Sequence, residues 1–185
     1  MLKDLMKETE SKMEKTVQLL SEDFRSIRTG RASPALVERL VIEYYGTMVP
    51  LNQVSTISAP EPRLLTIRPW ESAMLDPIEK AILKSDLGLT PNNDGKLIRL
   101  AIPRLSEERR QELVRVVGRK VEEAKVAIRN CRREAIDDLK EFEEEGMISE
   151  DDFYRGKEQI QEVTDQYIDK VDQVGARKED EIRQV

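Results

Sequence analysis

The chain of 185 residues contains no histidine and a single cysteine, Cys131. Without histidine it lacks the commonest general base and the side chain found in most zinc sites. A lone cysteine leaves no partner for an intramolecular disulfide and is typical of a reducing compartment. Glycine-rich phosphate loops and Gly-x-Ser-x-Gly motifs are absent as well. We therefore expect no enzyme, and no catalytic residue, cofactor or metal site.

Long apolar runs are also missing from the chain. No stretch approaches the ~20 consecutive apolar residues that a membrane-spanning helix requires. Residues 1–8 carry charges every few positions, whereas a secretory signal would show an apolar run there. From these absences we expect a cytoplasmic protein with no membrane partner.

Aromatic residues make up only 4% of the chain, whereas charged residues make up 37%. This balance favours long helices with narrow apolar seams over a thick globular core. Proline is placed unevenly, since six of the eight prolines lie in residues 50–91 and none follows Pro103. Composition alone therefore separates a middle segment from two helix-rich flanks.

Apolar residues recur at steps of three and four in three long segments, which predicts three amphipathic helices. The first covers residues 2–28, with Gly30 as its C-terminal cap. The second ends at Gly146, and the third begins after the N-terminal cap Ser149. Because each helix has one narrow stripe, the stripes must bury against one another, which predicts a three-helix bundle. The expected stripe of the third helix consists of Phe153, Ile160, Val163, Tyr167, Val171 and Val174.

Between residues 37 and 102 the pattern changes to short runs of β-forming residues, and Pro91-Asn92-Asn93-Asp94-Gly95 resembles a turn. One helix is expected at 77–85, with Ile78, Ile82 and Leu83 facing a small core, and Trp70 is expected to pack. The strand candidates are residues 40–45, 54–57, 64–67 and 97–102.

These patterns together predict an α+β protein in which a long three-helix bundle carries a small inserted domain. The bundle domain would comprise residues 1–30 and 105–185, and the β/α/β sandwich-like insertion would comprise residues 31–104. Because the chain enters and leaves the insertion, two connecting segments join it to the bundle. Such a double connection permits hinge bending without free tumbling.

The charge of the second predicted helix is strongly polarised. Residues 104–133 hold ten Lys and Arg against five Glu, a net charge of +5, whereas residues 134–152 hold ten acids and one lysine, a net charge of −9. At about 100° per residue, most of these cations fall on an arc separate from the apolar stripe. They are Arg115, Arg119, Lys125, Arg129, Arg132 and Arg133.

Guanidinium groups offer forked donors that match phosphate oxygens, so this stripe suits a folded RNA backbone. The alternative is that the arginines pair with Glu122, Glu123 and Glu134 or are simply solvated. Cys131 falls on the apolar arc and is assigned to the bundle core. The apolar arc consists of Leu113, Val117, Val121, Ala124, Ala127, Ile128, Cys131, Ala135, Leu139 and Phe142.

Several motifs, in order and over essentially the whole chain, resemble the family of ribosome recycling factors. They are Arg28-Thr29-Gly30-Arg31-Ala32-Ser33-Pro34, Val41-Ile42-Glu43-Tyr44-Tyr45-Gly46, Ile78-Glu79-Lys80-Ala81-Ile82, Ser85-Asp86-Leu87-Gly88-Leu89, Pro91-Asn92, Ile98-Arg99, Ile102-Pro103, Glu107-Glu108-Arg109-Arg110, Arg129-Asn130 and Arg132-Arg133.

The resemblance implies an L-shaped, monomeric protein that acts on the 70S ribosome with elongation factor G and GTP, splitting the post-termination ribosome into subunits. The bundle would contact large-subunit ribosomal RNA at the subunit interface, and the GTP would belong to the partner. The RNA contacts that it implies are Arg110, Arg129, Arg132 and Arg133. The hinge that it implies comprises Arg28, Thr29, Gly30, Arg31, Ala32 and Ser33 on one strand, and Pro103, Arg104 and Leu105 on the other.

Two other functions fit the residue patterns alone. A coiled-coil adaptor that binds protein helices would leave its apolar stripes exposed and would self-associate. A general RNA chaperone would bind many RNAs with similar affinity.

Overall fold

The computed structural model describes residues 1–184, and the chain divides into two compact units. One unit consists of residues 1–28 and 107–184, and the other of residues 29–106. Within residues 1–184, none of the helices combines the length and the apolar character that a membrane span requires.

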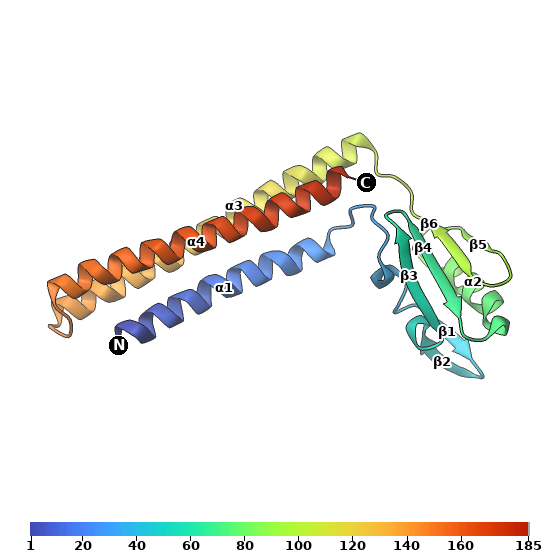
Figure 1. The fold of residues 1–185 in the computed structure, drawn as a ribbon, viewed down its shortest axis with the longest axis horizontal. Helices are drawn as coiled ribbons and strands as arrows, with labels where there is room; N and C mark the ends of the chain where they lie inside the picture. Colours follow the sequence, from blue (N-terminus) through green and yellow to red (C-terminus); the bar gives the residue numbers. More distant parts are fainter. Residues whose placement is uncertain (185) are drawn as a thin grey trace. The chain divides into compact units, whose positions relative to one another are not determined.

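The first unit is a bundle of the three long helices α1 (Leu2–Ser26), α3 (Glu107–Glu144) and α4 (Glu150–Arg183), each of which contacts the other two. Figure 1 shows α3 running antiparallel to α1 and α4. The predicted three-helix bundle is confirmed. Its buried side chains on α1 and α3 are Leu5, Thr9, Met13, Val17, Leu20, Phe24, Leu113, Val117, Ala124, Ile128, Ala135 and Leu139.

The stripe of α4 is only partly the predicted one. Ile160, Tyr167 and Val171 are buried, whereas Phe153, Val163 and Val174 are half-buried. The remaining buried positions of α4 are Gly156, Thr164, Gly175, Lys178 and Ile182. Apolar periodicity misses the first four because small and polar residues do not count as apolar, although Gly156 and Gly175 bring α4 close to α3.

The helix ends follow local chemistry. After α3, Gly146 has φ +71° and donates its N–H to the Glu143 carbonyl at 2.9 Å, while Met147 donates to Phe142 at 2.8 Å. This is a Schellman ending, as the glycine at that position predicts. Ser149 caps α4 by accepting a hydrogen bond from the Asp152 N–H at 3.1 Å.

The predicted role of Gly30 as a helix cap is wrong. Helix α1 ends at Ser26, and its C-cap residue Ile27 is extended with φ −80° and ψ 115°. Gly30 does have φ +76°, but it lies three residues beyond that cap. The glycine therefore serves a turn of the connecting segment and not the helix.

The second unit contains two antiparallel sheets, one α-helix, α2 (Leu75–Lys84), and three short 3-10 helices. One sheet pairs β1 (Val41–Tyr44) with β2 (Thr47–Pro50). The other has the order β3 (Ser55–Glu61), β4 (Leu64–Pro69), β6 (Ile98–Ala101) and β5 (Pro91–Asn93). Helix α2 contacts both β1 and β5, which confirms the predicted α+β class. The largest fully buried side chains of the second unit are Ile42, Leu51, Leu65, Ile67, Ile78, Ile82, Ile98 and Leu100.

Three sequence expectations for single side chains are wrong. Leu83 is 60% exposed because α2 presents only Leu75, Ile78 and Ile82 to the core. Trp70 is 67% exposed, and its indole Nε1 donates to Thr56 Oγ1 at 3.3 Å. Cys131 is half-buried at the edge of the seam, where burial raises the pKa of its thiol.

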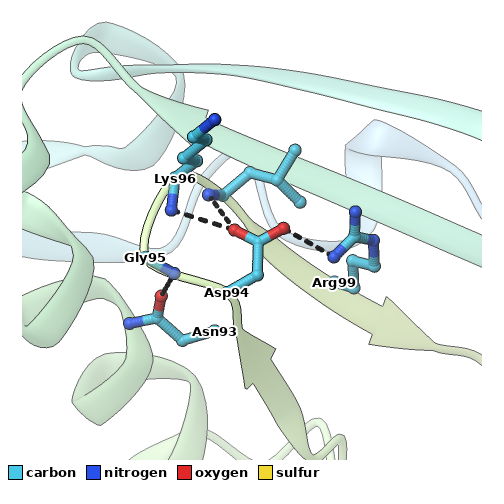
Figure 2. Close-up of polar contacts among 6 residues, drawn as sticks. Asn93, Asp94, Gly95, Lys96 and Arg99 are labelled. Atoms are coloured by element: carbon cyan, nitrogen blue, oxygen red, sulfur yellow. Dashed lines mark hydrogen bonds and ion pairs between the residues drawn. The ribbon is translucent and has the colours of Figure 1, made fainter.

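The segment predicted as a turn at 91–95 is instead an edge strand followed by a tighter turn (Figure 2). Asp94 Oδ1 accepts from the N–H groups of Lys96 and Leu97, both at 2.9 Å, and Arg99 Nη1 lies 2.7 Å from Asp94 Oδ2. Hydrogen bonds to the charged form favour it, so the two backbone N–H groups, with a smaller contribution from Arg99, lower the pKa of Asp94 to about 2. Pro91 is tolerated in β5 because that strand lies at the sheet edge.

Candidate nucleic-acid interface

Helix α3 carries the predicted cations over much of its 38 residues, a length of about 57 Å at ~1.5 Å per residue. All residues of this helix lie in the bundle unit. The surroundings of each cation depend on its position around the helix, because side chains near the seam meet α1 or α4 and those opposite the seam do not.

Lysines beside the seams are held in ion pairs between helices. Lys125 Nζ lies 2.6 Å from Asp172 Oδ1 of α4, and the Lys125 side chain is only 17% exposed. Lys120 Nζ lies 3.4 Å from Asp23 Oδ2 of α1. Lys125 was a sequence candidate for RNA binding, and this pairing means that a phosphate would have to compete with Asp172.

Four of the predicted arginines have no such pairing. Among residues 1–184, the guanidinium groups of these side chains make no hydrogen bond or ion pair. Arg129 is half-buried and the other three are exposed. They present positive charge along about 27 Å of the helix, from position 115 to position 133 at ~1.5 Å per residue. The four residues are Arg115, Arg119, Arg129 and Arg133.

Arg132 is oriented without being neutralised. Its Nη1 donates to Gln161 Oε1 of α4 at 3.2 Å, and Gln161 Nε2 donates to Asp165 Oδ1 at 2.8 Å. The direct acceptor is an uncharged amide, so the hydrogen bond orients the Arg132 side chain without neutralising its positive charge. A contact 29 residues away in sequence leaves no periodic signal, so sequence reasoning missed Gln161.

Two of the three acids named in the alternative interpretation bind lysines. Glu122 Oε1 lies 3.7 Å from Lys125 Nζ, and Glu134 Oε2 lies 3.7 Å from Lys12 Nζ. The pKa of Lys12 is raised, chiefly by its hydrogen bond to Glu8. No pair between these glutamates and the α3 arginines is present in residues 1–184. The α3 arginines therefore stay positively charged and open to a ligand. We call them the arginine row, which consists of Arg115, Arg119, Arg129, Arg132 and Arg133.

Arg110 differs from the row because it lies near the start of α3. Its side chain is 23% exposed, and its Nη1 lies 3.7 Å from Glu107 Oε2. The side chain is half-buried, and the guanidinium Nε is itself buried.

The predicted hinge segments are both anchored on one turn of the second unit, the turn between β3 and β4. Ala32 donates its N–H to the Pro62 carbonyl at 2.7 Å, and Ile102 donates to the Arg63 carbonyl at 2.8 Å. Thr29 and Ala32 are buried, whereas the exposed candidates are Arg28, Arg31, Ser33, Pro103 and Arg104.

Gly30 and Leu105 bring the two segments into contact. A Cβ built on Gly30 would lie 3.2 Å from Leu105 Cγ, and the glycine has φ +76°. Both the space and the backbone conformation therefore favour glycine at this position.

A family model described as "Ribosome recycling factor" matches residues 20–182. The chain belongs to the ribosome recycling factor family. The ribosome-recycling factor of Carboxydothermus hydrogenoformans is 56% identical over 98% of both chains. That of Heliobacterium modesticaldum is 54% identical over 100% of both.

Solved structures of ribosome recycling factors agree with the fold. A solution structure of the ribosome recycling factor matches with a TM-score of 0.71 and 44% identity, covering 100% of this chain and 98% of that one. A second match, with a TM-score of 0.62, 49% identity and 98% coverage of both chains, comes from models of the T. thermophilus ribosome recycling factor and E. coli elongation factor G bound to the E. coli post-termination complex. Members of the ribosome recycling factor family are translation factors.

Proposed function

We propose that this chain recycles ribosomes by splitting the post-termination 70S ribosome into subunits together with elongation factor G and GTP. Membership of the ribosome recycling factor family supports the reaction, and the relative bound with elongation factor G to a post-termination complex supports the partners. One observation of this molecule carries the proposal, namely the α3 arginines that lack an internal partner within residues 1–184.

The arginine row would bind large-subunit ribosomal RNA at the subunit interface. Each guanidinium offers paired N–H donors to two phosphate oxygens. Such charge-assisted hydrogen bonds are stronger than hydrogen bonds between neutral groups. The acidic C-terminal end of α3, residues 134–144, would be repelled by RNA, so the bundle would dock in one orientation. The main contacts to the RNA backbone would come from the arginine row, that is Arg129, Arg132, Arg133, Arg115 and Arg119. Arg110 would make a peripheral contact, and Lys125 would contribute more weakly.

The chain would supply binding and leverage, and elongation factor G would supply the GTP hydrolysis. The proposed hinge lies in residues 28–33 and 103–105, where two strands of chain leave the bundle unit. Bending there would let the unit of residues 29–106 pivot when the partner pushes on it, while the bundle stays on the RNA. The protein would act as a cytoplasmic monomer and catalyse no covalent step itself.

Sedimentation of 70S ribosomes tests the proposal. Adding this protein with elongation factor G and GTP is expected to convert 70S particles into subunits, whereas leaving out any one of the three is expected to preserve them. The double variant Arg129→Gln/Arg133→Gln is expected to lose most of this activity. A matched control, Lys3→Gln/Lys15→Gln, removes two charges from exposed positions of α1 and is expected to split ribosomes normally.

The experiment also separates the other two functions. Apolar stripes buried among three helices leave little for a coiled-coil adaptor to bind, and the family match does not favour that reading. A general RNA chaperone would bind unrelated RNA as tightly as ribosomes and would not split 70S particles. Splitting that requires all three components would exclude both.

A further inference from the structure

A concavity of about 560 Å³ lies where α3 begins and α4 ends. It is lined by three arginines and one acid, with two neutral side chains between them. All of these belong to the bundle unit. The lining residues are Glu107, Arg110, Gln111, Val114, Arg115 and Arg183.

Arg183 comes from the last turn of α4 and is weakly held. Its Nη2 lies 3.4 Å from Glu179 Oε2, and its side chain is 63% exposed. An exposed ion pair between residues four apart in a helix contributes little and is easily exchanged for a better partner. The guanidinium of Arg183 is therefore available to a ligand in the concavity.

The other two arginines add positive charge to the concavity. Arg115 has no partner within residues 1–184, and Arg110 is half-buried and so less mobile. Three guanidinium groups against the Glu107 carboxylate leave a net charge of +2 on the lining. Guanidinium groups converging from two directions suit a tetrahedral anion whose oxygens point several ways.

We propose that this concavity binds one backbone phosphate of ribosomal RNA, and that Arg183 is a contact contributed by α4. The inference rests on the proposed function and extends the proposed RNA contacts from α3 to α4. An RNA backbone is favoured over a free anion because Arg115 belongs both to the concavity and to the α3 row, so a strand lying along the row reaches the concavity without a break. Contacts from two helices would also fix the rotation of the bundle about its long axis.

The variant Arg183→Gln tests the assignment. Affinity for 70S ribosomes is expected to fall roughly tenfold, and the slope of log affinity against log salt is expected to flatten by about 1, as for the loss of one phosphate contact. The matched control is Arg177→Gln, which removes the same charge from an exposed position of α4 outside the concavity. That control is expected to bind like the original protein.

A second pair of variants tests the sign of the effect. Glu107→Gln removes the only carboxylate of the lining and is expected to bind ribosomes roughly twofold to fivefold tighter. Its control is Glu108→Gln, which alters the neighbouring exposed position outside the lining and is expected to have a smaller effect. Arg183→Lys keeps the charge but loses the fork, and is expected to bind with intermediate affinity.

The outcomes separate this inference from the proposed function. If the original protein fails to bind and split ribosomes, the proposed function is overturned. If it binds but Arg183→Gln and Arg177→Gln are indistinguishable, the phosphate assignment is overturned and the function stands. Titration with inorganic phosphate, followed through the NMR signal of the Arg183 guanidinium, covers the remaining case. A response there without any effect of Arg183→Gln on ribosome binding would identify a site for free anions and would also overturn the assignment.

Discussion

Gly175 of α4 faces Val121 of α3 so closely that a Cβ built on the glycine would lie 2.6 Å from Val121 Cγ2. Real Cβ atoms essentially never approach another atom that closely, so α4 fits against α3 here only because residue 175 has no side chain. Gly156 makes a similar approach, with its added Cβ at 3.0 Å from Leu139 Cδ1. The α3–α4 seam thus depends on two glycines nineteen positions apart on one helix.

Gly175→Ala is expected to lower the free energy of unfolding by about 1–3 kcal/mol, as overpacking of a well-filled core does. Helix propensity alone would favour alanine by up to ~1 kcal/mol, so a destabilising result means that the steric effect has won. Urea unfolding followed by circular dichroism at 222 nm measures the change. A variant more stable than the original would contradict the close packing at this site.

Gly118→Ala is the matched case with the opposite expected sign. A Cβ built on Gly118 meets nothing within 4 Å, and the residue lies within α3. Removing the backbone freedom of glycine there is expected to raise the free energy of unfolding by about 0.5–1 kcal/mol. The same urea experiment measures the free energy of unfolding of both variants. A loss of stability for Gly118→Ala would contradict the open space around this position.

Arg132→Glu is expected to weaken 70S binding by roughly tenfold or more, because the substitution places a carboxylate where a phosphate would lie. Thermal unfolding is expected to change little, since the only polar contact of Arg132 within residues 1–184 is the exposed hydrogen bond to Gln161. Binding is measured by sedimentation at several salt concentrations. Equal losses of binding and stability would assign Arg132 to the fold and not to the RNA.

Asp94 should make the stability of the second unit depend on pH. Its folded pKa of about 2 lies below the ordinary value of 3.8, so its stabilising effect is fully present above pH ~4 and is lost as the pH falls toward 2. An NMR titration of the carboxylate should give a midpoint near 2. Asp94→Asn should be less stable than the original at pH 7 and closer to it at pH 2, and a midpoint near 4 would contradict the hydrogen-bonded turn.

Gly30→Ala should disturb the proposed hinge for two reasons, the left-handed backbone and the contact with Leu105. The backbone alone costs roughly 1–2 kcal/mol for a residue with a Cβ. Gly88→Ala isolates that cost, because Gly88 has φ +65° and open space around its built Cβ. Gly30→Ala is expected to lose more stability than Gly88→Ala and also to slow ribosome splitting.

Adding Leu105→Ala to the Gly30→Ala variant should restore part of the splitting rate by making room for the new methyl group. Splitting is followed by light scattering with elongation factor G and GTP. If Gly30→Ala splits ribosomes at the original rate, the contact between the two connecting segments has no part in the reaction.

Helix existence and class could be predicted because the apolar period repeats over several turns. Helix α3 follows the prediction closely, including the end of the helix at Gly146. Residues 91–93 show the opposite case, since Pro91-Asn92-Asn93 has the composition of a turn yet forms an edge strand. Its pairing with β6 depends on the tertiary structure, which local composition does not show. Leu83 fails for a related reason, because only packing decides which side of a short helix is covered.

The candidate interface was predictable to a similar degree. Periodicity places the arginines on one face of α3, but it does not tell which cations have a partner on another helix. Lys125 and Arg132 lie on the same predicted arc, yet Lys125 meets the carboxylate of Asp172 and Arg132 meets the amide of Gln161. Arg183 could not be predicted at all, because its neighbours in the concavity lie some seventy positions earlier in the chain.

The division of cations on α3, with Lys120 and Lys125 tied across seams and Arg119 and Arg133 left open, has an evolutionary consequence. Under the proposed function, a substitution of Arg119 or Arg133 would change ribosome affinity with little effect on folding, whereas a substitution of Lys120 or Lys125 would chiefly remove an ion pair between helices. Ribosome affinity could then change in small steps while the helical scaffold stays the same. Lineages whose ribosomal RNA differs could adjust their factor one arginine at a time.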